Sequence, residues 1–268
     1  MGKFDGVLLA SDFDDTLYAS TMEVSAENCR AIEYFTGEGG WFTVATGRAH
    51  PTFAPHAADA PINCPVVLSN GSGLYDFQQN RMICETFLPD RARDDLAEVA
   101  GAIPELGFEA YHGDDIYLHN PNQVTWNHLS RAGCRGTECP IGEMPLPWSK
   151  VILQQRREVL ERVRAYLLER WAEHYEVIFS NAVLLELTRK GSSKGGMVLR
   201  LAQYLGVDPA HIYCVGDNEN DIPMLAISAI PFAPANCARI VKDWGPRLVR
   251  SCDESCIAEI IEILDKRY

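Results

Sequence analysis

The sequence has little positive charge for its length. Its 268 residues include 24 Lys and Arg against 37 Asp and Glu, which gives a formal net charge of −13. Such a surface repels phosphodiester backbones and anionic lipid headgroups, so we expect neither nucleic acid nor a membrane as a partner. A small anionic ligand stays possible, because one local positive site can outweigh the mean field of the chain.

Paired cysteines and long apolar runs are missing as well. The nine cysteines are an odd number and form no Cys-x-x-Cys pair, which argues against a disulfide framework. No apolar run approaches the ~20 residues of a membrane-spanning helix. The first residues lack the charged-then-apolar pattern of an export signal. We therefore expect a soluble protein of the reducing cytoplasm.

Two nucleotide-binding patterns are incomplete. Residues 191–196 read Gly-Ser-Ser-Lys-Gly-Gly and do not have the spacing of a Walker A loop. Residues 71–73 read Gly-Ser-Gly and lack the third glycine of a dinucleotide-binding fingerprint. We therefore expect neither a P-loop nor a nicotinamide cofactor.

Short apolar runs alternate with amphipathic segments at both ends of the chain. Strands are predicted over residues 6–10, 41–45, 65–69 and 212–215, and helices over 25–35, 194–205 and 256–266. Strands separated by helices are typical of parallel βαβ units. The sequence therefore predicts an α/β fold with a Rossmann-like parallel-sheet core.

The middle of the chain has a different texture. Two segments there each read as a helix followed by two strands; the predicted helices are 91–102 and 156–171. A helix followed by paired strands favours an α+β insertion with a sheet of its own. The predicted domains are a core of residues 1–83 and 184–268 and an inserted α+β domain of residues 84–183.

The strongest chemical signal is the run Ser-Asp-Phe-Asp-Asp-Thr-Leu at residues 11–17, after the first predicted strand. Three carboxylates within four residues repel one another, and a divalent cation is the natural counter-charge. The carboxyl edge of a parallel sheet is also where α/β proteins hold their active sites. If the strand continues, Asp12 and Asp14 point to the same side, so one could attack while the other transfers a proton.

Three further strand ends carry polar residues. Thr46 and Gly47 follow the second strand, where a hydroxyl and backbone N–H groups can bind an anion. Lys194 opens a helix against the macrodipole, a position that neutralising a phosphate would explain. Asp217 and Asp221 follow the last predicted strand and could act as a metal ligand and its support. Taken alone, each of these signals could be a helix cap or a solvated lysine. Taken together, the signals favour a single active site.

In this order, the motifs resemble those of the haloacid dehalogenase-like phosphatase superfamily. The matching motifs are DFDDT (12–16), ATGR (45–48), the lysine of SSKGG (192–196) and GDNEND (216–221). With SNGSG (69–73) and PFAPAN (231–236), the chain resembles the Cof-like, subfamily IIB sugar-phosphate phosphatases over nearly its whole length. One departure is Asp15, where many members carry glycine.

The resemblance implies roles for these residues. Asp12 would attack phosphorus and form an aspartyl-phosphate, and Asp14 would act as the acid and then the base. Mg²⁺ would be bound by the Asp12 and Asp217 carboxylates and the Asp14 backbone carbonyl. The phosphate-binding residues implied are Phe13, Thr46, Gly47, Lys194 and Asn220, supported by Asp221 and Arg48. The inserted domain would be a cap that selects a small phosphorylated metabolite, a sugar phosphate, in a monomer or weak homodimer.

Two alternatives stay open. A phosphotransferase or phosphosugar mutase would use the same chemistry but return the phosphoryl group to a sugar hydroxyl. A non-catalytic phosphometabolite-binding protein would keep a stable phosphorylated state. Asp14 argues against the second alternative, because a carboxylate able to activate water shortens the lifetime of a phosphoaspartate.

Overall fold

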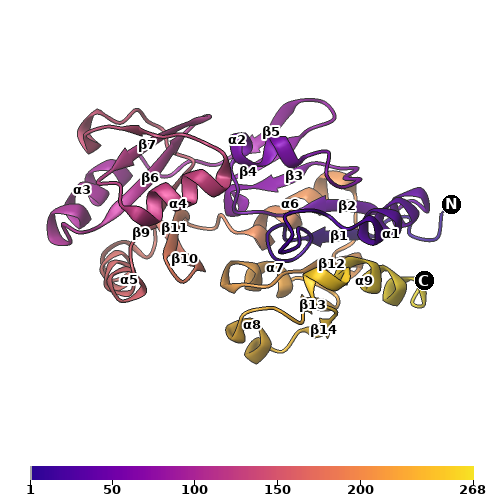
Figure 1. Ribbon diagram of the computed structural model, residues 1–268. Coiled ribbons are helices and arrows are strands. Elements are labelled where there is room, and N and C mark those ends of the chain that lie inside the picture. The colour runs from indigo at the N-terminus through magenta and orange to yellow at the C-terminus, as the bar shows by residue number, and fades with distance from the viewer. Residues whose placement is uncertain (1) are drawn as a thin grey trace. The chain divides into compact units, whose positions relative to one another are not determined.

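The computed structural model describes residues 2–268, which form two compact units (Figure 1). The core unit comprises the residues up to Arg48, Phe53–Cys84 and Ser193–Tyr268, and the inserted unit comprises Ala49–Thr52 and Glu85–Ser192. None of the helices within residues 2–268 is long and apolar enough to cross a bilayer.

The core unit is built on a parallel sheet with the strand order β14-β13-β12-β1-β2. Its strands are β1 (Leu8–Ser11), β2 (Trp41–Val44), β12 (Ile212–Val215), β13 (Pro231–Pro234) and β14 (Arg247–Val249). A bridge between Ala45 and Val67 links this sheet to a second one. The second sheet contains β3 (Val66–Leu68), β4 (Gly73–Asp76) and β5 (Arg81–Glu85).

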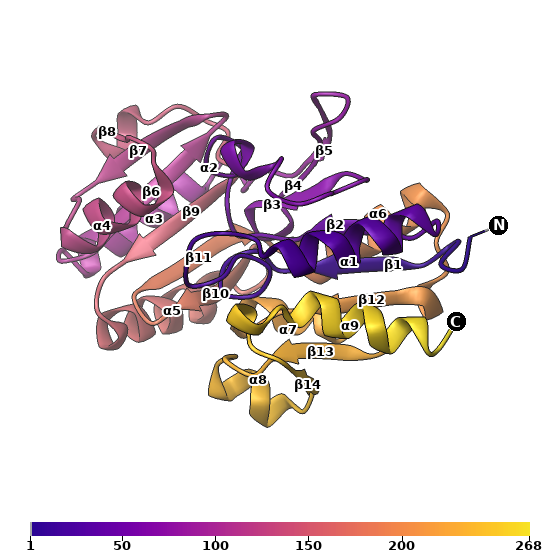
Figure 2. The same cartoon turned by 45° about the vertical axis from the view of Figure 1, so that its right-hand side comes forward.

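Helices cover both faces of the parallel sheet, because its strands are apolar on both sides. Leu9 packs in one apolar cluster with α1 (Ala26–Gly37) and α9 (Cys256–Asp265), which lie side by side (Figure 2). Leu8 points to the opposite face and packs with the other helices of this unit. These are α6 (Lys194–Leu205), α7 (Ile222–Leu225) and α8 (Arg239–Trp244).

Local signals fix the ends of α6, the helix that carries Lys194. The Ser193 side chain accepts a hydrogen bond from the Gly196 N–H at 3.1 Å, which caps the first turn. Gly206 ends the helix in the left-handed conformation, with φ of 73°. The predicted range of 194–205 is confirmed, and the cap places Lys194 at the first helical position.

The inserted unit contains one sheet with the strand order β10-β11-β9-β6-β7-β8. Its strands are β6 (Gly107–His112), β7 (Asp115–His119), β8 (Thr137–Glu138), β9 (Lys150–Gln154), β10 (Tyr175–Asn181) and β11 (Leu184–Arg189). Helices α3 (Ala92–Ala102) and α5 (Arg157–Trp171) pack on the face that carries Phe108. Helix α4 (Gln123–Ala132) packs on the face that carries Tyr111, and the short α2 (His50–Phe53) falls mostly within this unit.

The predicted fold class is confirmed, but one predicted domain boundary is wrong. The core was expected to resume at residue 184, whereas β11 pairs with both β9 and β10 and belongs to the inserted sheet. The chain therefore returns to the core unit at Ser193. Strand pairing decides this boundary, because a strand that supplies the backbone partners of two neighbours cannot be separated from them.

Candidate active site

Asp12 directly follows the carboxyl end of β1, which lies between β12 and β2 in the parallel sheet. Its backbone N–H donates to the Val215 carbonyl at 2.9 Å, so backbone pairing with the β12 strand extends one residue past β1. The residue is 6% exposed, and its Oδ1 accepts a hydrogen bond from Lys194 Nζ at 2.5 Å. A buried carboxylate needs such a partner to stay charged.

Lys194 is almost fully buried, at 1% exposure, so it is not a solvated surface lysine. Its Nζ also donates to Asp221 Oδ1 at 2.7 Å. Burial alone would lower the pKa of Lys194, but the charges of Asp12 and Asp221 outweigh it and raise that pKa above its ordinary value. The ammonium therefore remains charged and bridges two carboxylates.

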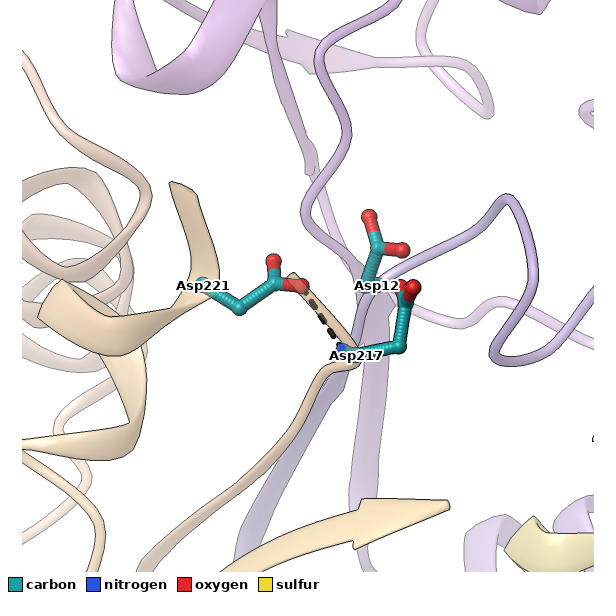
Figure 3. Close-up of side chains that lie close together, drawn as sticks. All are labelled: Asp12, Asp217 and Asp221. Carbon is teal, nitrogen blue, oxygen red and sulfur yellow. Dashed lines mark hydrogen bonds between the residues drawn. The ribbon is translucent and has the colours of Figure 1, made fainter. Parts of the chain in front are cut away.

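The Asp221 side chain fixes the loop between β12 and α7 by accepting hydrogen bonds from the backbone of that loop. Its Oδ2 accepts hydrogen bonds from the Asp217 N–H at 2.9 Å, drawn in Figure 3, and from the Asn218 N–H at 3.0 Å. Gly216 makes room for it, because a Cβ at that position would lie 2.4 Å from the Asp221 side chain. The fully buried Asp221 thus fixes the loop on which Asp217 stands.

Three carboxylates gather at this edge of the sheet. Oxygens of Asp12, Asp217 and Asp221 lie within 4.8 Å of one another (Figure 3), and Lys194 balances one of the three charges. Burial, followed by repulsion from Asp221, raises the pKa of Asp217 to about 7 and the pKa of Asp12 well above its ordinary range. Buried carboxylate oxygens with uncompensated negative charge are the donor set that hard divalent cations prefer.

Thr16 was not predicted as a site residue but contacts the acidic cluster. Its hydroxyl donates to Asp217 Oδ1 at 3.2 Å, and the residue is fully buried. Thr16 therefore helps to orient the Asp217 carboxylate, while Asp221 fixes the backbone of the same residue. The signal was present in the sequence, since a hydroxyl closes the DFDDT motif.

The Asp14 carboxylate has a partner of its own. Arg48 donates to it twice, from Nε to Oδ2 at 2.9 Å and from Nη2 to Oδ1 at 2.7 Å. The Arg48 guanidinium carbon lies 5.1 Å from the centre of the Phe13 ring and 5.8 Å from that of Tyr18. Arg48 is thus held by two aromatic faces while it fixes both oxygens of Asp14.

The strand does not continue as far as Asp14. β1 ends at Ser11, and the Tyr18 N–H returns to the Phe13 carbonyl at 2.8 Å to form a loop. The condition under which strand alternation would align Asp12 with Asp14 is therefore not met, and the loop sets the direction of Asp14. The Phe13 ring stacks on Tyr18 at 4.7 Å and is buried, so only the Phe13 backbone could meet a phosphate.

Thr46 lies just after β2 and is 1% exposed. Its Oγ1 accepts a hydrogen bond from the Arg48 N–H at 3.0 Å, which leaves the hydroxyl hydrogen to donate to an acceptor. The Arg48 N–H is thereby engaged, and Gly47 lies between these two residues in the turn after β2.

Asn220 links the loop after β12 to the turn after β3. It lies in the 3₁₀ turn η5 (Glu219–Asp221) and is 8% exposed. Its Nδ2 donates to Asn70 Oδ1 at 3.0 Å. Asn70 belongs to the turn η2 (Ser69–Gly71) after β3 and was not predicted as a site residue.

The sequence matches the family model of haloacid dehalogenase-like hydrolases over residues 9–261. The match includes every motif-bearing strand end described above. The chain therefore belongs to the haloacid dehalogenase-like hydrolase family, as its motifs indicated.

Curated relatives of similar length carry phosphatase names. The putative phosphatase YxeH of Bacillus subtilis is 27% identical over 267 residues, which cover 96% of this chain and 97% of the relative. The 5-amino-6-(5-phospho-D-ribitylamino)uracil phosphatase YwtE of the same organism is 24% identical, with coverage of 96% and 97%. Together with the family match, these relatives confirm the predicted enzyme class, a phosphatase.

Solved structures confirm the fold. A haloacid dehalogenase-like hydrolase from Bacteroides thetaiotaomicron has a TM-score of 0.83 at 24% identity and covers 98% of this chain and 100% of its own. The subclass IIB sugar phosphatase BT4131 has a TM-score of 0.85 at 18% identity, with coverage of 97% and 99%. At these identities the likeness concerns the architecture, an α/β core with an insertion.

Proposed function

We propose that the chain is a Mg²⁺-dependent phosphomonoester hydrolase that acts on small phosphorylated metabolites through an aspartyl-phosphate at Asp12. One observation carries the proposal. The Asp12 carboxylate is buried just past the carboxyl end of β1, an interior strand of the parallel sheet, beside a buried lysine and two further carboxylates. This arrangement combines a nucleophile with the charges that phosphoryl transfer requires.

The acidic cluster fits a magnesium ion, because its carboxylates exceed its one ammonium group by two charges. The Asp12 and Asp217 carboxylates would hold the ion, together with the Asp14 backbone carbonyl that the family resemblance implies. Bound there, Mg²⁺ would mask the charge between the nucleophile and a phosphate dianion. Asp221 is already engaged by Lys194 and two backbone N–H groups, so it would support the site without being a principal ligand.

In the first step, an Asp12 Oδ would attack phosphorus while the bond to the ester oxygen breaks. The Asp14 carboxyl would give its proton to the departing alcohol oxygen. Arg48 donates hydrogen bonds to both Asp14 oxygens and would orient that carboxyl. Arg48 would withdraw from one of these oxygens when the carboxyl reaches the leaving group. Lys194 Nζ, the Thr46 hydroxyl, Asn220 and the Phe13 and Gly47 backbones would bind the phosphoryl oxygens.

In the second step, Asp14, now a carboxylate, would take a proton from water as the water oxygen attacks phosphorus. The bond between phosphorus and Asp12 would break, which releases inorganic phosphate and restores the Asp12 carboxylate. Asp14 would then carry the proton needed for the next cycle. Two easier displacements thus replace one difficult hydrolysis.

The substrate class that we propose is a sugar or polyol phosphate. The motif resemblance to sugar-phosphate phosphatases supports it, and so does the phosphorylated ribityl chain in the name of one relative. We assign to the inserted unit the role of a cap that selects the leaving group. We further expect a cytoplasmic enzyme, monomeric or weakly dimeric, whose nine cysteines are all free thiols.

The test is phosphate release from a panel of sugar phosphates, nucleotides and p-nitrophenyl phosphate, with Mg²⁺, with EDTA, and with Asp12→Asn. Metal-dependent turnover that the variant loses would support the proposal. Turnover that needs a sugar acceptor and releases no free phosphate would favour a phosphotransferase. No turnover of any ester by folded, Mg²⁺-loaded protein would favour a binding protein and contradict the proposal.

A further inference from the structure

The turn η2 after β3 has an unusual backbone. Ser69 and Asn70 have φ angles of 51° and 52°, and Gly71 follows with φ of 94°. Left-handed conformations are unfavourable for residues that carry a Cβ, and backbone strain of this kind concentrates at functional sites. All three residues are buried. The strain therefore lies inside the core unit, where packing must hold it.

The turn contacts three of the segments that carry the family motifs. The Asn70 N–H donates to the Thr46 carbonyl at 3.0 Å, and Asn70 Oδ1 accepts the Asn220 amide. Gly71 lies against the residue before Lys194, because a Cβ on Gly71 would be 2.1 Å from the Ser193 carbonyl oxygen. Asn70 is thus placed among the residues proposed to bind the phosphoryl oxygens.

The Asn70 side chain is only half satisfied. The residue is 6% exposed, and its Oδ1 has Asn220 as a donor. Its Nδ2 is shielded from solvent and has no hydrogen-bond partner among residues 2–268. A buried amide donor without an acceptor is unfavourable and rare, so this N–H group indicates an acceptor that the folded chain does not supply.

We propose that Asn70 is a phosphoryl-binding residue, whose Nδ2 donates to a phosphoryl oxygen while its Oδ1 orients the Asn220 amide beside it. This proposal rests on the proposed phosphatase function, since Thr46 and Asn220 define where the phosphoryl group lies. The amide contributes a directed hydrogen bond without a charge. It therefore adds to phosphate binding without competing for the carboxylates of the acidic cluster.

Two substitutions separate direct binding from positioning. Asn70→Gly removes the amide, and glycine adopts a φ of 52° without strain, so the turn is kept. Asn70→Asp keeps an acceptor for Asn220 but replaces the donor with a charged oxygen. Asn80→Gly is the matched control, because Asn80 also has a left-handed backbone, with φ of 49°, but is exposed between β4 and β5.

The measurements are calorimetric binding of inorganic phosphate at saturating Mg²⁺ and hydrolysis of p-nitrophenyl phosphate. Asn70→Gly should weaken phosphate binding about ten- to a hundredfold, the range for a hydrogen bond to a charged group. Asn70→Asp should weaken it further, because a carboxylate then faces the dianion. Asn80→Gly should bind phosphate like the wild type, and thermal unfolding confirms that each variant is folded.

Three outcomes would overturn the proposal. Phosphate binding by Asn70→Gly within twofold of the wild type would mean that the amide makes no contact. Wild-type binding by Asn70→Asp, with weak binding by Asn70→Gly, would mean that Asn70 only orients Asn220. A wild-type protein that neither binds nor hydrolyses phosphate would overturn the proposed function first. The first two outcomes leave the phosphatase function standing, so the two failures are distinguishable.

Discussion

Both units bury carboxylates, but in opposite electrostatic settings. In the inserted unit, the Glu109 carboxylate accepts hydrogen bonds from His128 Nδ1 at 2.9 Å, Gln154 Nε2 at 2.5 Å and Tyr111 Oη at 2.8 Å. Burial alone would raise the pKa of Glu109, yet His128, Gln154 and Tyr111 outweigh it and lower that pKa. The fold itself provides everything that this charge requires.

In the core unit, the fold leaves the buried carboxylates only partly compensated. The pKa values of Asp12 and Asp217 are raised by burial and by repulsion from Asp221, and Lys194 is one cation among three carboxylates. A buried charge that the fold satisfies has a structural role, whereas a charge left uncompensated is prepared for a ligand. The difference between these two clusters distinguishes the candidate active site from the scaffold more clearly than burial does.

The largest expected effect comes from matched carboxylate-to-amide changes in the two clusters. Asp12→Asn should lower kcat for any ester by roughly 10⁴-fold or more, because it removes the proposed nucleophile. Glu109→Gln should leave kcat within about twofold but lower the thermal unfolding temperature. The loss of a carboxylate oxygen leaves buried hydrogen-bond donors without an acceptor. Steady-state kinetics and calorimetry check both variants. A comparable loss of kcat in Glu109→Gln would contradict the contrast.

Lys194→Met should have the next largest effect. It should lower kcat/KM by about 10²- to 10³-fold, because it removes the cation that we propose to bind the phosphoryl oxygens. The metal-free variant should also unfold at a lower temperature, since two buried carboxylates lose their counter-charge. Lys190→Met is the control, because that side chain is 50% exposed. Near wild-type kcat/KM in Lys194→Met would show that the lysine is structural only.

Arg48→Lys should have a smaller and more selective effect. Lysine cannot hold both oxygens of Asp14 from one planar group, so the general acid loses its orientation. Turnover of alkyl phosphates should fall about tenfold more than turnover of p-nitrophenyl phosphate, whose leaving group needs no proton. Asp14→Asn should show the same selectivity. Equal losses on both esters would indicate that Arg48 acts on the fold and not on Asp14.

The smallest expected effect is a pH dependence of stabilisation by Mg²⁺. Asp217 has a pKa of about 7 in the metal-free fold, above that of an unfolded Asp, so its contribution to stability is lost as the pH rises through about 7. Mg²⁺ binds the deprotonated carboxylate and should raise the unfolding temperature more at about pH 8 than at about pH 6. Thermal scans with and without Mg²⁺ test this, and equal shifts at both pH values would contradict it.

The sequence predicted those parts of the molecule in which local signals and tertiary packing agree. The strand 212–215 and the helix 194–205 match the observed bounds, because an uninterrupted apolar run and a serine cap mark them. The acidic residues of the site could be predicted for a similar reason. They follow buried parallel strands, and the ends of such strands meet at one edge of the sheet.

The rest depended on long-range pairing that a single sequence does not display. Strand β9 was not predicted, because Lys150 and Gln154 at its ends read as surface residues but are buried between β6 and β11. Helix α4 was missed as well, although the capping box of Asn122 and Thr125 at its start is a local signal. In the site, the contact between Asn70 and Asn220 joins residues 150 positions apart, which no local pattern predicts.

The way Asp221 holds its neighbours has a consequence for the kinetics of metal exchange. Its two oxygens fix the Asp217–Asn218 backbone and Lys194 within the chain itself, so the loop is ordered before an ion arrives. The entropy of ordering that loop is then part of the folding free energy and not of metal affinity. Mg²⁺ should therefore bind and dissociate without local unfolding, so we expect it to exchange rapidly at a preorganised binding site.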